Sequence, residues 1–222
     1  MNIEGQFYSD KHAHYFANAR LDVLPLLPEH IDKVLEIGAA NGATLAHIKG
    51  QWPSARTVAV EPFPVAAAKA RGCVDVVLED TLENLSAADF ADAPFDVILC
   101  LDVLEHMVDP WAAVAKLTGL LVPGGRIVAS ITNVSHSSSL FPLLFKNQWK
   151  LTDHGVLDRT HLRFFVKDSA VELMTSSGLK LHDVRPIFQD QGGPRDRLNK
   201  LTFGMFERFV AQQYSVTVVR ER

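Results

Sequence analysis

The stretch that decides the fold is Val34-Leu35-Glu36-Ile37-Gly38-Ala39-Ala40-Asn41-Gly42. Its first four residues form a short apolar run, and a turn with two glycines follows. Between a buried strand and a helix, such a turn lets a ligand approach bare backbone N–H groups at the helix N-terminus. A dinucleotide fingerprint needs glycine at positions 40 and 43, where this chain has Ala40 and Ala43. The shorter pattern Gly38-x-Ala40-x-Gly42 keeps two of its three glycines, so an NAD site fits less well.

Similar apolar runs recur downstream of this stretch. Together they cover residues 34–37, 57–60, 74–78, 95–101 and 126–131, and they are rich in β-branched side chains. Runs of this length and composition are typical of buried parallel strands. Helix-like segments at 64–71 and 110–121 lie between them, and Pro123-Gly124-Gly125 ends the second. The alternation predicts an α/β fold with one doubly wound, mostly parallel sheet and right-handed crossovers.

The residues before and after these runs show other patterns. Residues 1–30 are interpreted as a helical N-terminal cap, and residues 133–165 as an insertion rich in aromatic and histidine residues. A helix is expected at 168–177 with Gly178 as its C-cap, followed by strand-like runs at 179–188 and 214–220 around a short helix-like stretch. We expect residues 1–222 to form a single domain.

Composition excludes several classes of protein. The chain has 222 residues, of which 47% are hydrophobic and 22% charged, which argues against disorder. Its net charge of −4 disfavours nucleic acid as a partner. Two cysteines, Cys73 and Cys100, are too few for a disulfide framework or a thiolate zinc site, and both are predicted to pack in the core. No apolar stretch is long enough to span a membrane, so we expect a cytoplasmic protein.

Acidic residues follow three successive strand candidates. Glu61 ends the second run, where a carboxylate can accept both hydroxyls of a ribose. Asp80 follows the third run, where it can accept from an adenine amine, and Asp102 follows the fourth. Any one of them can equally be a solvated loop acid or a helix cap. Together with the glycine turn, they predict a ligand crevice at the carboxyl ends of the strands.

Residues 34–42, 58–62, 95–106 and 121–125 resemble the successive motifs of class I S-adenosylmethionine-dependent methyltransferases. The resemblance implies a Rossmann-like seven-stranded sheet with an antiparallel last strand, and S-adenosyl-L-methionine as cofactor. It departs from the common pattern at Ala40, where many members have glycine. The expected cofactor-binding residues are Tyr15, Arg20, Glu36, Gly38, Ala39, Gly42, Glu61, Pro62, Asp80, Leu101 and Asp102.

Two of these residues come from the N-terminal cap. Arg20 can pair bidentately with the cofactor carboxylate, and Tyr15 can close over the site. The alternative is a helix packed on the sheet edge with Arg20 solvated. The sequence leaves both interpretations open.

Residues 133–165 are expected to form a lid over the methyl acceptor, and we call them the acceptor segment. The segment resembles a methyltransferase subgroup associated with polysaccharide and sugar natural-product pathways, which implies a sugar-like small-molecule acceptor. Its polar residues suit a polyol, and its aromatic residues can face sugar C–H groups. The alternative is that the aromatic residues form the lid core and that Asp158 pairs with Arg159 or Arg163. A quinone-like acceptor, N-methylation and an inactive methyltransferase-like binding domain remain alternative functions.

Methylation of a hydroxyl needs a base, and histidine titrates near neutrality. His106 follows the fourth strand beside the expected transfer position, and His161 and His136 lie in the acceptor segment. The catalytic candidates are therefore His106, His161, His136 and Asp158. No close-spaced acidic cluster indicates a metal. The sequence leaves a homo-oligomer open.

Overall fold

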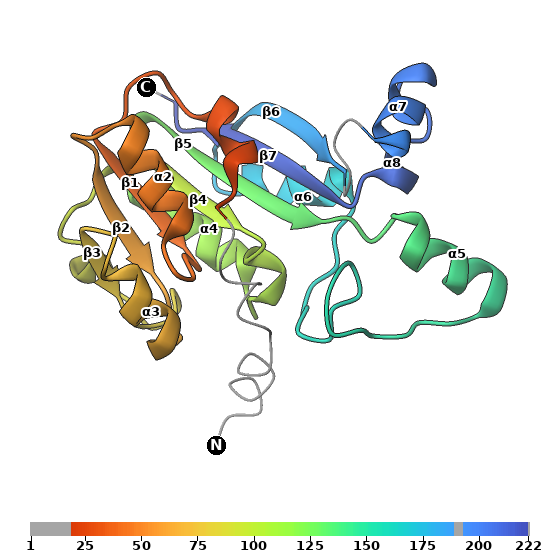
Figure 1. Ribbon diagram of the computed structural model, residues 1–222, viewed down its shortest axis with the longest axis horizontal. Helices are drawn as coiled ribbons and strands as arrows, with labels where there is room; N and C mark the ends of the chain where they lie inside the picture. Colours follow the sequence, from red (N-terminus) through yellow and green to blue (C-terminus); the bar gives the residue numbers. More distant parts are fainter. Residues whose placement is uncertain (1–18, 189–192, 222) are drawn as a thin grey trace.

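A computed structural model describes residues 19–188 and 193–221 (Figure 1). Within these residues, seven strands form a sheet in the order β3-β2-β1-β4-β5-β7-β6. Strand β7 runs antiparallel to both of its neighbours, and the pairs from β3 to β5 are parallel. The predicted seven-stranded, mostly parallel sheet with an antiparallel last strand is confirmed.

The strands are β1 Lys33–Ile37, β2 Arg56–Val60, β3 Val76–Leu78, β4 Phe95–Leu101, β5 Leu121–Thr132, β6 Lys180–Ile187 and β7 Gln213–Val219. The α-helices are α2 Ala43–Gln51, α3 Pro64–Ala70, α4 Pro110–Gly119, α5 Ser137–Lys146, α6 Lys167–Thr175, α7 Pro194–Leu201 and α8 Glu207–Val210. Short 3-10 helices are η1 Leu21–Leu26, η2 Ala87–Asp89 and η3 Leu104–His106.

The main difference from the predicted strands is the start of β5. Leu121 already pairs with Phe95, and the register then shifts before Val97 meets Arg126. The extra residues between these pairs bulge, with Gly124 at a φ of 86°. The Pro-Gly-Gly sequence, predicted to end the helix, therefore lies inside a bulged strand, and α4 ends two residues earlier than predicted.

Helices cover both faces of the sheet, because successive side chains of a strand point to opposite faces. On one face, α4 and α6 pack Val114, Leu117 and Leu173 against the strands. On the other face, η1 and α2 contribute a second buried group, including Leu45 and Ile48. Figure 1 shows the sheet between these two layers. Because the helices cover the faces of the sheet, the connecting loops occupy the carboxyl ends of the strands.

Outside the sheet, only part of the expected cap is described, and the prediction for Cys73 is corrected. Residues 1–18, which hold Tyr15 and most of the expected cap, lie outside the described residues, and the described part of the cap forms the 3-10 helix η1. Cys100 is buried as predicted, but Cys73 is exposed, because the turn after α3 leaves it at the surface. Among the described residues, no helix is long and apolar enough to cross a membrane.

The acceptor segment leaves the sheet and returns to the same place. Asn133, just after β5, forms a parallel bridge with Phe165, and the Val134 amide donates to the Phe165 carbonyl at 2.8 Å. Between these ends lies α5, which the sequence did not single out because it is rich in serine and contains Pro142. Figure 1 shows α5 projecting from the end of the molecule.

Candidate functional site

The loop between β1 and α2 lies at the switch point of the sheet. Strands β1 and β4 are neighbours although two strands separate them in sequence, and open α/β sheets bind ligands outside this point. Gly38, Ala40 and Gly42 have φ values of 69°, 48° and 77°. A Cβ on Gly38 would lie 2.6 Å from Cγ2 of Val103. Glycine is therefore required at position 38 by both backbone conformation and space.

The amides of this loop are not bare, which corrects the predicted role of the glycines. The Gly38 and Ala39 amides donate to the Val60 carbonyl at 2.8 and 3.2 Å, and the Gly42 amide donates to the Ala39 carbonyl at 2.8 Å. The loop folds back on the end of β2, whose last carbonyl accepts these bonds. The glycines thus shape the loop and allow its close packing; these amides do not serve as open donors for a ligand.

Glu61 at the end of β2 is fixed by the same loop. Its Oε2 accepts from the Ala40 amide at 2.8 Å, and its Oε1 accepts from the Phe63 amide at 3.0 Å. The side chain is buried, and this burial raises its pKa although the two amides oppose the shift. Each carboxylate oxygen can accept a second bond. The arrangement therefore keeps acceptor capacity for a diol at the predicted ribose position.

Glu36 in β1 is a buried carboxyl beneath the loop. Burial raises its pKa to about 8, and the Thr44 hydroxyl and the Arg20 charge oppose that shift. Within the described part of the chain, its Oε2 has no hydrogen-bond partner. An unpartnered buried polar atom is costly, so this oxygen is a candidate acceptor for a ligand group.

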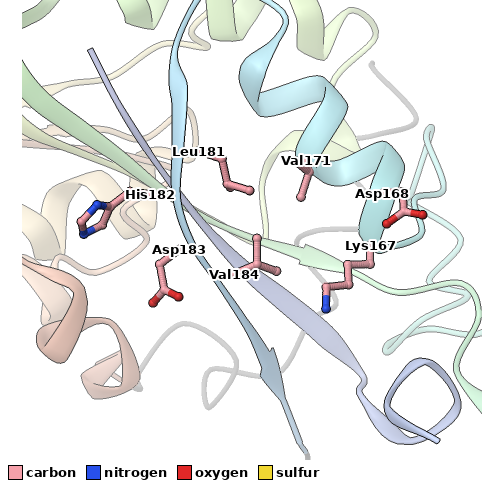
Figure 2. Close-up of a pocket in the computed structure, with 7 residues that line it drawn as sticks. All are labelled: Lys167, Asp168, Val171, Leu181, His182, Asp183 and Val184. Atoms are coloured by element: carbon pink, nitrogen blue, oxygen red, sulfur yellow. The ribbon is translucent and has the colours of Figure 1, made fainter. Parts of the chain in front are cut away.

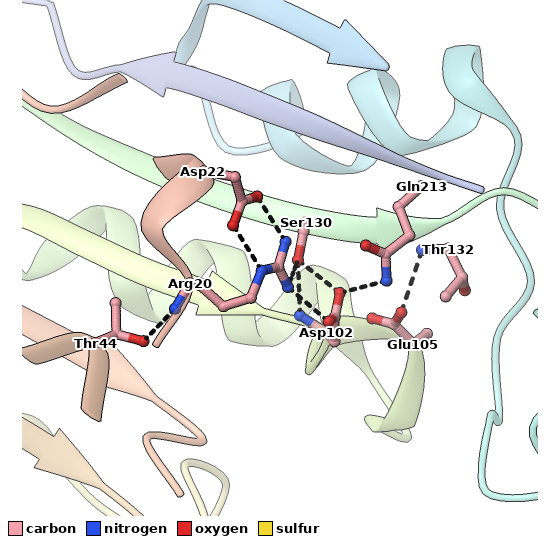
Figure 3. Close-up of polar contacts among 8 residues, drawn as sticks. All are labelled: Arg20, Asp22, Thr44, Asp102, Glu105, Ser130, Thr132 and Gln213. Carbon is pink, nitrogen blue, oxygen red and sulfur yellow. Dashed lines mark hydrogen bonds and ion pairs between the residues drawn. The ribbon is translucent and has the colours of Figure 1, made fainter. Parts of the chain in front are cut away.

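Arg20 lies over the carboxyl ends of β4 and β5 (Figure 3). Its guanidinium pairs bidentately with Asp22, at 2.9 Å for both bonds, and donates to Asp102 at 2.7 Å and to Ser130 at 3.2 Å. Burial would lower its pKa, but the Asp22 hydrogen bonds and the Asp102 charge raise it. The open alternative of a solvated Arg20 is wrong, and its bidentate partner here is Asp22.

Asp102 joins this network from a strained backbone, with a φ of 58°. Its Oδ1 accepts from Ser130 Oγ at 2.6 Å and from Gln213 Nε2 at 2.9 Å. Sequence reasoning identified Asp102 but missed Ser130 and Gln213. They come from β5 and β7, and only the antiparallel pairing of these strands brings them to the same place.

Glu105 is a second carboxyl that sequence reasoning missed. It is fully buried, its Oε1 accepts from the Thr132 amide at 3.2 Å, and its Oε2 has no partner among the described residues. Burial and the nearby Asp102 charge raise its pKa. Its backbone carbonyl accepts the amides of Leu162 and Arg163, at 2.8 and 3.0 Å. Glu105 therefore ties the β4 end to the acceptor segment.

The remaining cofactor candidates lie around this cluster. Ala39 and Leu101 are buried at the ends of β1 and β4, and Pro62 directly follows Glu61. Asp80 follows β3, and its Oδ1 accepts from the Thr81 amide and from Asn84 Nδ2, each at 2.7 Å. Tyr15 lies outside the described residues.

Three of the four catalytic candidates form one connected group. The rings of His106 and His161 meet edge to face, with centroids 4.7 Å apart. His106 Nδ1 lies 3.0 Å from the Thr160 carbonyl, and His161 Nδ1 lies 3.1 Å from the Val156 carbonyl. A carbonyl only accepts, so each Nδ1 carries the proton of its hydrogen bond.

Asp158 supports this group from behind. Its Oδ1 accepts from the amide and the hydroxyl of Thr160, at 2.9 and 2.7 Å. Thr160 is the residue whose carbonyl holds His106. Asp158 thus holds Thr160 in place through Oδ1.

His136 has a different place from the other three. It caps the N-terminus of α5, where Nδ1 contacts Ser138 Oγ at 2.7 Å. Burial and the Arg195 charge lower its pKa. The structure thus gives His136 a capping role, which the sequence did not indicate because histidine is not among the preferred N-cap residues.

A groove of about 530 Å³ lies elsewhere, at the sheet edge formed by β6 (Figure 2). It is lined by Lys167, Asp168, Val171, Leu181, His182, Asp183 and Val184. None of the predicted site residues is among them. The described residues include no group of three or more His, Cys, Asp or Glu side chains that could hold a metal ion.

Comparison with known proteins yields both a family and a fold. The family described as "Methyltransferase domain" matches residues 9–184. Two curated relatives are both ubiquinone biosynthesis O-methyltransferases. The protein of Xylella fastidiosa is 30% identical over 128 residues, which cover 55% of this chain and 51% of that protein. The protein of Vibrio vulnificus is 26% identical over 185 residues, which cover 80% of this chain and 76% of that protein.

Solved structures show the same fold. A possible histamine N-methyltransferase from Thermotoga maritima superposes with a TM-score of 0.62 and 18% identity, covering 90% of this chain and 87% of that one. The plantazolicin methyltransferase, solved in complex with a substrate analogue and SAH, gives a TM-score of 0.59 and 15% identity, covering 87% and 78%.

Proposed function

The chain belongs to the methyltransferase domain family, and on that premise we propose that it transfers a methyl group from S-adenosyl-L-methionine to a hydroxyl of a small molecule. The observation that carries the proposal is the carboxyl cluster at the switch point. Glu36 and Asp102 lie close to Arg20, and Glu36 also lies close to Glu61. These carboxyl groups offer hydrogen-bond acceptors to the polar groups of the cofactor.

The residues present fit this cofactor. The unpartnered Oε2 of Glu36 can accept from the cofactor's ammonium group, and Arg20 can bind its carboxylate. Glu61 keeps acceptor capacity for the ribose, and in this proposal the Asp80 carboxylate accepts from the adenine amine. In support, the plantazolicin methyltransferase with the same fold was solved with SAH bound.

When bound, the cofactor supplies a methyl group that its positively charged sulfur activates. The chain's own contribution is orientation and proton removal. His106 accepts the hydroxyl proton at Nε2, because the Thr160 carbonyl keeps its other nitrogen protonated. His161 packs against that ring, and Asp158 holds Thr160 in place. Correct orientation of the acceptor oxygen lowers the barrier further.

For the acceptor, we favour a phenol-like or quinol-like hydroxyl. The relatives named as ubiquinone biosynthesis O-methyltransferases support this class. So does a local feature of the acceptor segment: Trp149 and Phe164, both partly exposed, meet edge to face 5.3 Å apart, and Phe164 also contacts the His161 ring. Flat aromatic surfaces beside the histidines suit a flat acceptor ring. The sugar-like acceptor expected from the sequence stays a prediction.

The test is a methyl-transfer assay with labelled S-adenosylmethionine. Catechols and quinols of increasing apolar substitution form one panel, and sugars and nucleotide-sugars form the second. The proposal expects labelled product from the first panel, and from wild type but not from a His106→Ala, His161→Ala double variant. Transfer only to sugars would overturn the phenol-like acceptor. No cofactor binding, measured separately by calorimetry, would overturn methyl transfer itself.

A further inference from the structure

Large apolar side chains are exposed together at one end of the molecule. On α5 they are Phe141, Leu143, Leu144 and Phe145, and on the α7–α8 hairpin they are Leu201, Phe203, Met205 and Phe206. We call this set the apolar tip. Figure 1 shows α5, α7 and α8 at the same end, away from β1–β3, and the rings of Phe141 and Phe209 join the two elements at 6.3 Å.

Several side chains of the apolar tip are largely exposed. Phe203 is 100% exposed and Phe145 is 79% exposed. Leu143, Leu144 and Phe145 are consecutive on a helix, so at about 100° per residue they spread over about 200° of its circumference. Ser139 is the buried residue of α5. The helix thus presents apolar side chains around much of its surface, which fits immersion in an apolar medium better than contact with one flat face.

The two segments that carry the apolar tip contain more basic than acidic residues. Residues 134–152 contain two lysines, Lys146 and Lys150, and no Asp or Glu, and both lysines are exposed. Residues 194–210 add four basic and two acidic residues. These two segments therefore hold six basic and two acidic residues, whereas the rest of the chain holds 16 basic and 24 acidic residues. Positive charge is concentrated at this end of a chain that is otherwise acidic.

From this combination we propose that the apolar tip inserts shallowly into the surface of a bilayer that contains anionic lipid. Exposed aromatic and leucine side chains flanked by lysine and arginine are the features of an interfacial membrane contact. A second copy of the chain fits less well, because a two-fold contact would place the basic rim of one copy against the basic rim of the other. The inference goes beyond methyl transfer and does not rest on it.

Flotation of the full chain with lipid vesicles tests this proposal without cofactor or acceptor. We expect the wild type to float with vesicles of phosphatidylcholine and phosphatidylglycerol, and to float poorly with phosphatidylcholine alone. The double variant Phe145→Ser, Phe203→Ser should bind the anionic vesicles at least about tenfold more weakly, because each exposed ring loses its apolar contact. Val65→Ser is the matched control, since Val65 is 74% exposed on α3 outside the tip.

The charge contribution has its own pair of variants. Lys146→Glu with Lys150→Glu should weaken binding to anionic vesicles about tenfold or more, whereas Lys69→Glu on α3 should leave it unchanged. All these positions are exposed, and circular dichroism checks that each variant is folded. The proposal is overturned if the wild type does not float with anionic vesicles, or if the apolar-tip variants float as it does. It is also overturned if the wild type is a dimer that Phe145→Ser converts to a monomer while vesicles remain unbound.

Discussion

The Ala40 amide donates to Oε2 of Glu61 across 2.8 Å, so the loop after β1 and the carboxylate after β2 hold each other in place. This bond explains how the chain tolerates alanine at a φ of 48°, where glycine is the usual residue. The loop's shape comes from backbone bonds to the end of β2, and the side chain at position 40 is not needed for it.

Substitutions in the loop should therefore differ by position. Ala40→Gly relieves a strained backbone, so we expect thermal stability within about 1 kcal/mol of wild type and retained cofactor binding. Gly38→Ala combines a left-handed φ with a Cβ 2.6 Å from Val103, so it should lose about 2 kcal/mol or more of unfolding free energy. Urea unfolding and calorimetry measure both. Equal effects of the two changes would contradict this reading of the loop.

The raised pKa of Glu36 predicts that the free energy of unfolding depends on pH. The folded state holds its proton up to a pKa of about 8, whereas the ordinary value is 4.5. Between these values the folded state binds more protons than the unfolded chain, so its unfolding free energy falls as pH rises. The fall attributable to Glu36 approaches about 1.4 kcal/mol per pH unit.

Glu36→Gln should remove this part of the slope, because glutamine mimics the protonated carboxyl. Urea unfolding of wild type and variant between pH 5 and pH 8 measures the difference, with the exposed Glu29→Gln as control. Parallel pH profiles of wild type and Glu36→Gln would show that Glu36 does not carry the effect.

Variants of Arg20 should affect binding of the amino-acid part of the cofactor more than binding of its adenosine part. Arg20→Ala should weaken binding of S-adenosylhomocysteine about tenfold or more, because a charge-assisted pair with its carboxylate is lost. Binding of methylthioadenosine, which lacks the amino-acid part, should change little. Arg20→Lys should recover only part of the loss, since lysine has no planar fork. If both ligands weaken equally, Arg20 acts through Asp22 and Asp102 on the loop instead.

Variants of His106 and His161 test whether a histidine removes the hydroxyl proton. Single-turnover methyl transfer should fall about 100-fold or more in His106→Ala, with a similar or smaller fall in His161→Ala. His136→Ala is the control, because that residue caps α5 and its variant should mainly lose stability. Wild-type rates in both His106→Ala and His161→Ala would rule out a histidine base.

Local patterns predicted the elements that depend on local physics. Runs of β-branched residues located β1, β2 and β4, and acidic residues at strand ends located Glu61 and Asp102. The start of β5 was missed because Pro123 and Gly124 read as a stop, whereas pairing with Phe95 makes them a bulge.

The unpredicted part of the site depends on distant pairings. Gln213 reaches Asp102 across 111 positions of sequence, through the antiparallel β5–β7 pair. Glu105 belongs to a motif named in the sequence analysis, but its carbonyl accepts the amides of Leu162 and Arg163, which lie far along the chain. The predicted bare amides were wrong because the glycine turn alone does not show that Val60 accepts them.

Titration calorimetry of S-adenosylhomocysteine into wild type and Glu61→Ala tests the proposed cofactor site most directly. Glu61 holds the Ala40 amide of the loop and lies at the proposed ribose position, so we expect micromolar binding by wild type and a loss of about 100-fold or more in the variant. Glu79→Ala, which removes an exposed neighbouring carboxylate paired with Arg71, should bind as wild type. An absence of binding heat for wild type, or undiminished binding by Glu61→Ala, would contradict the cofactor site.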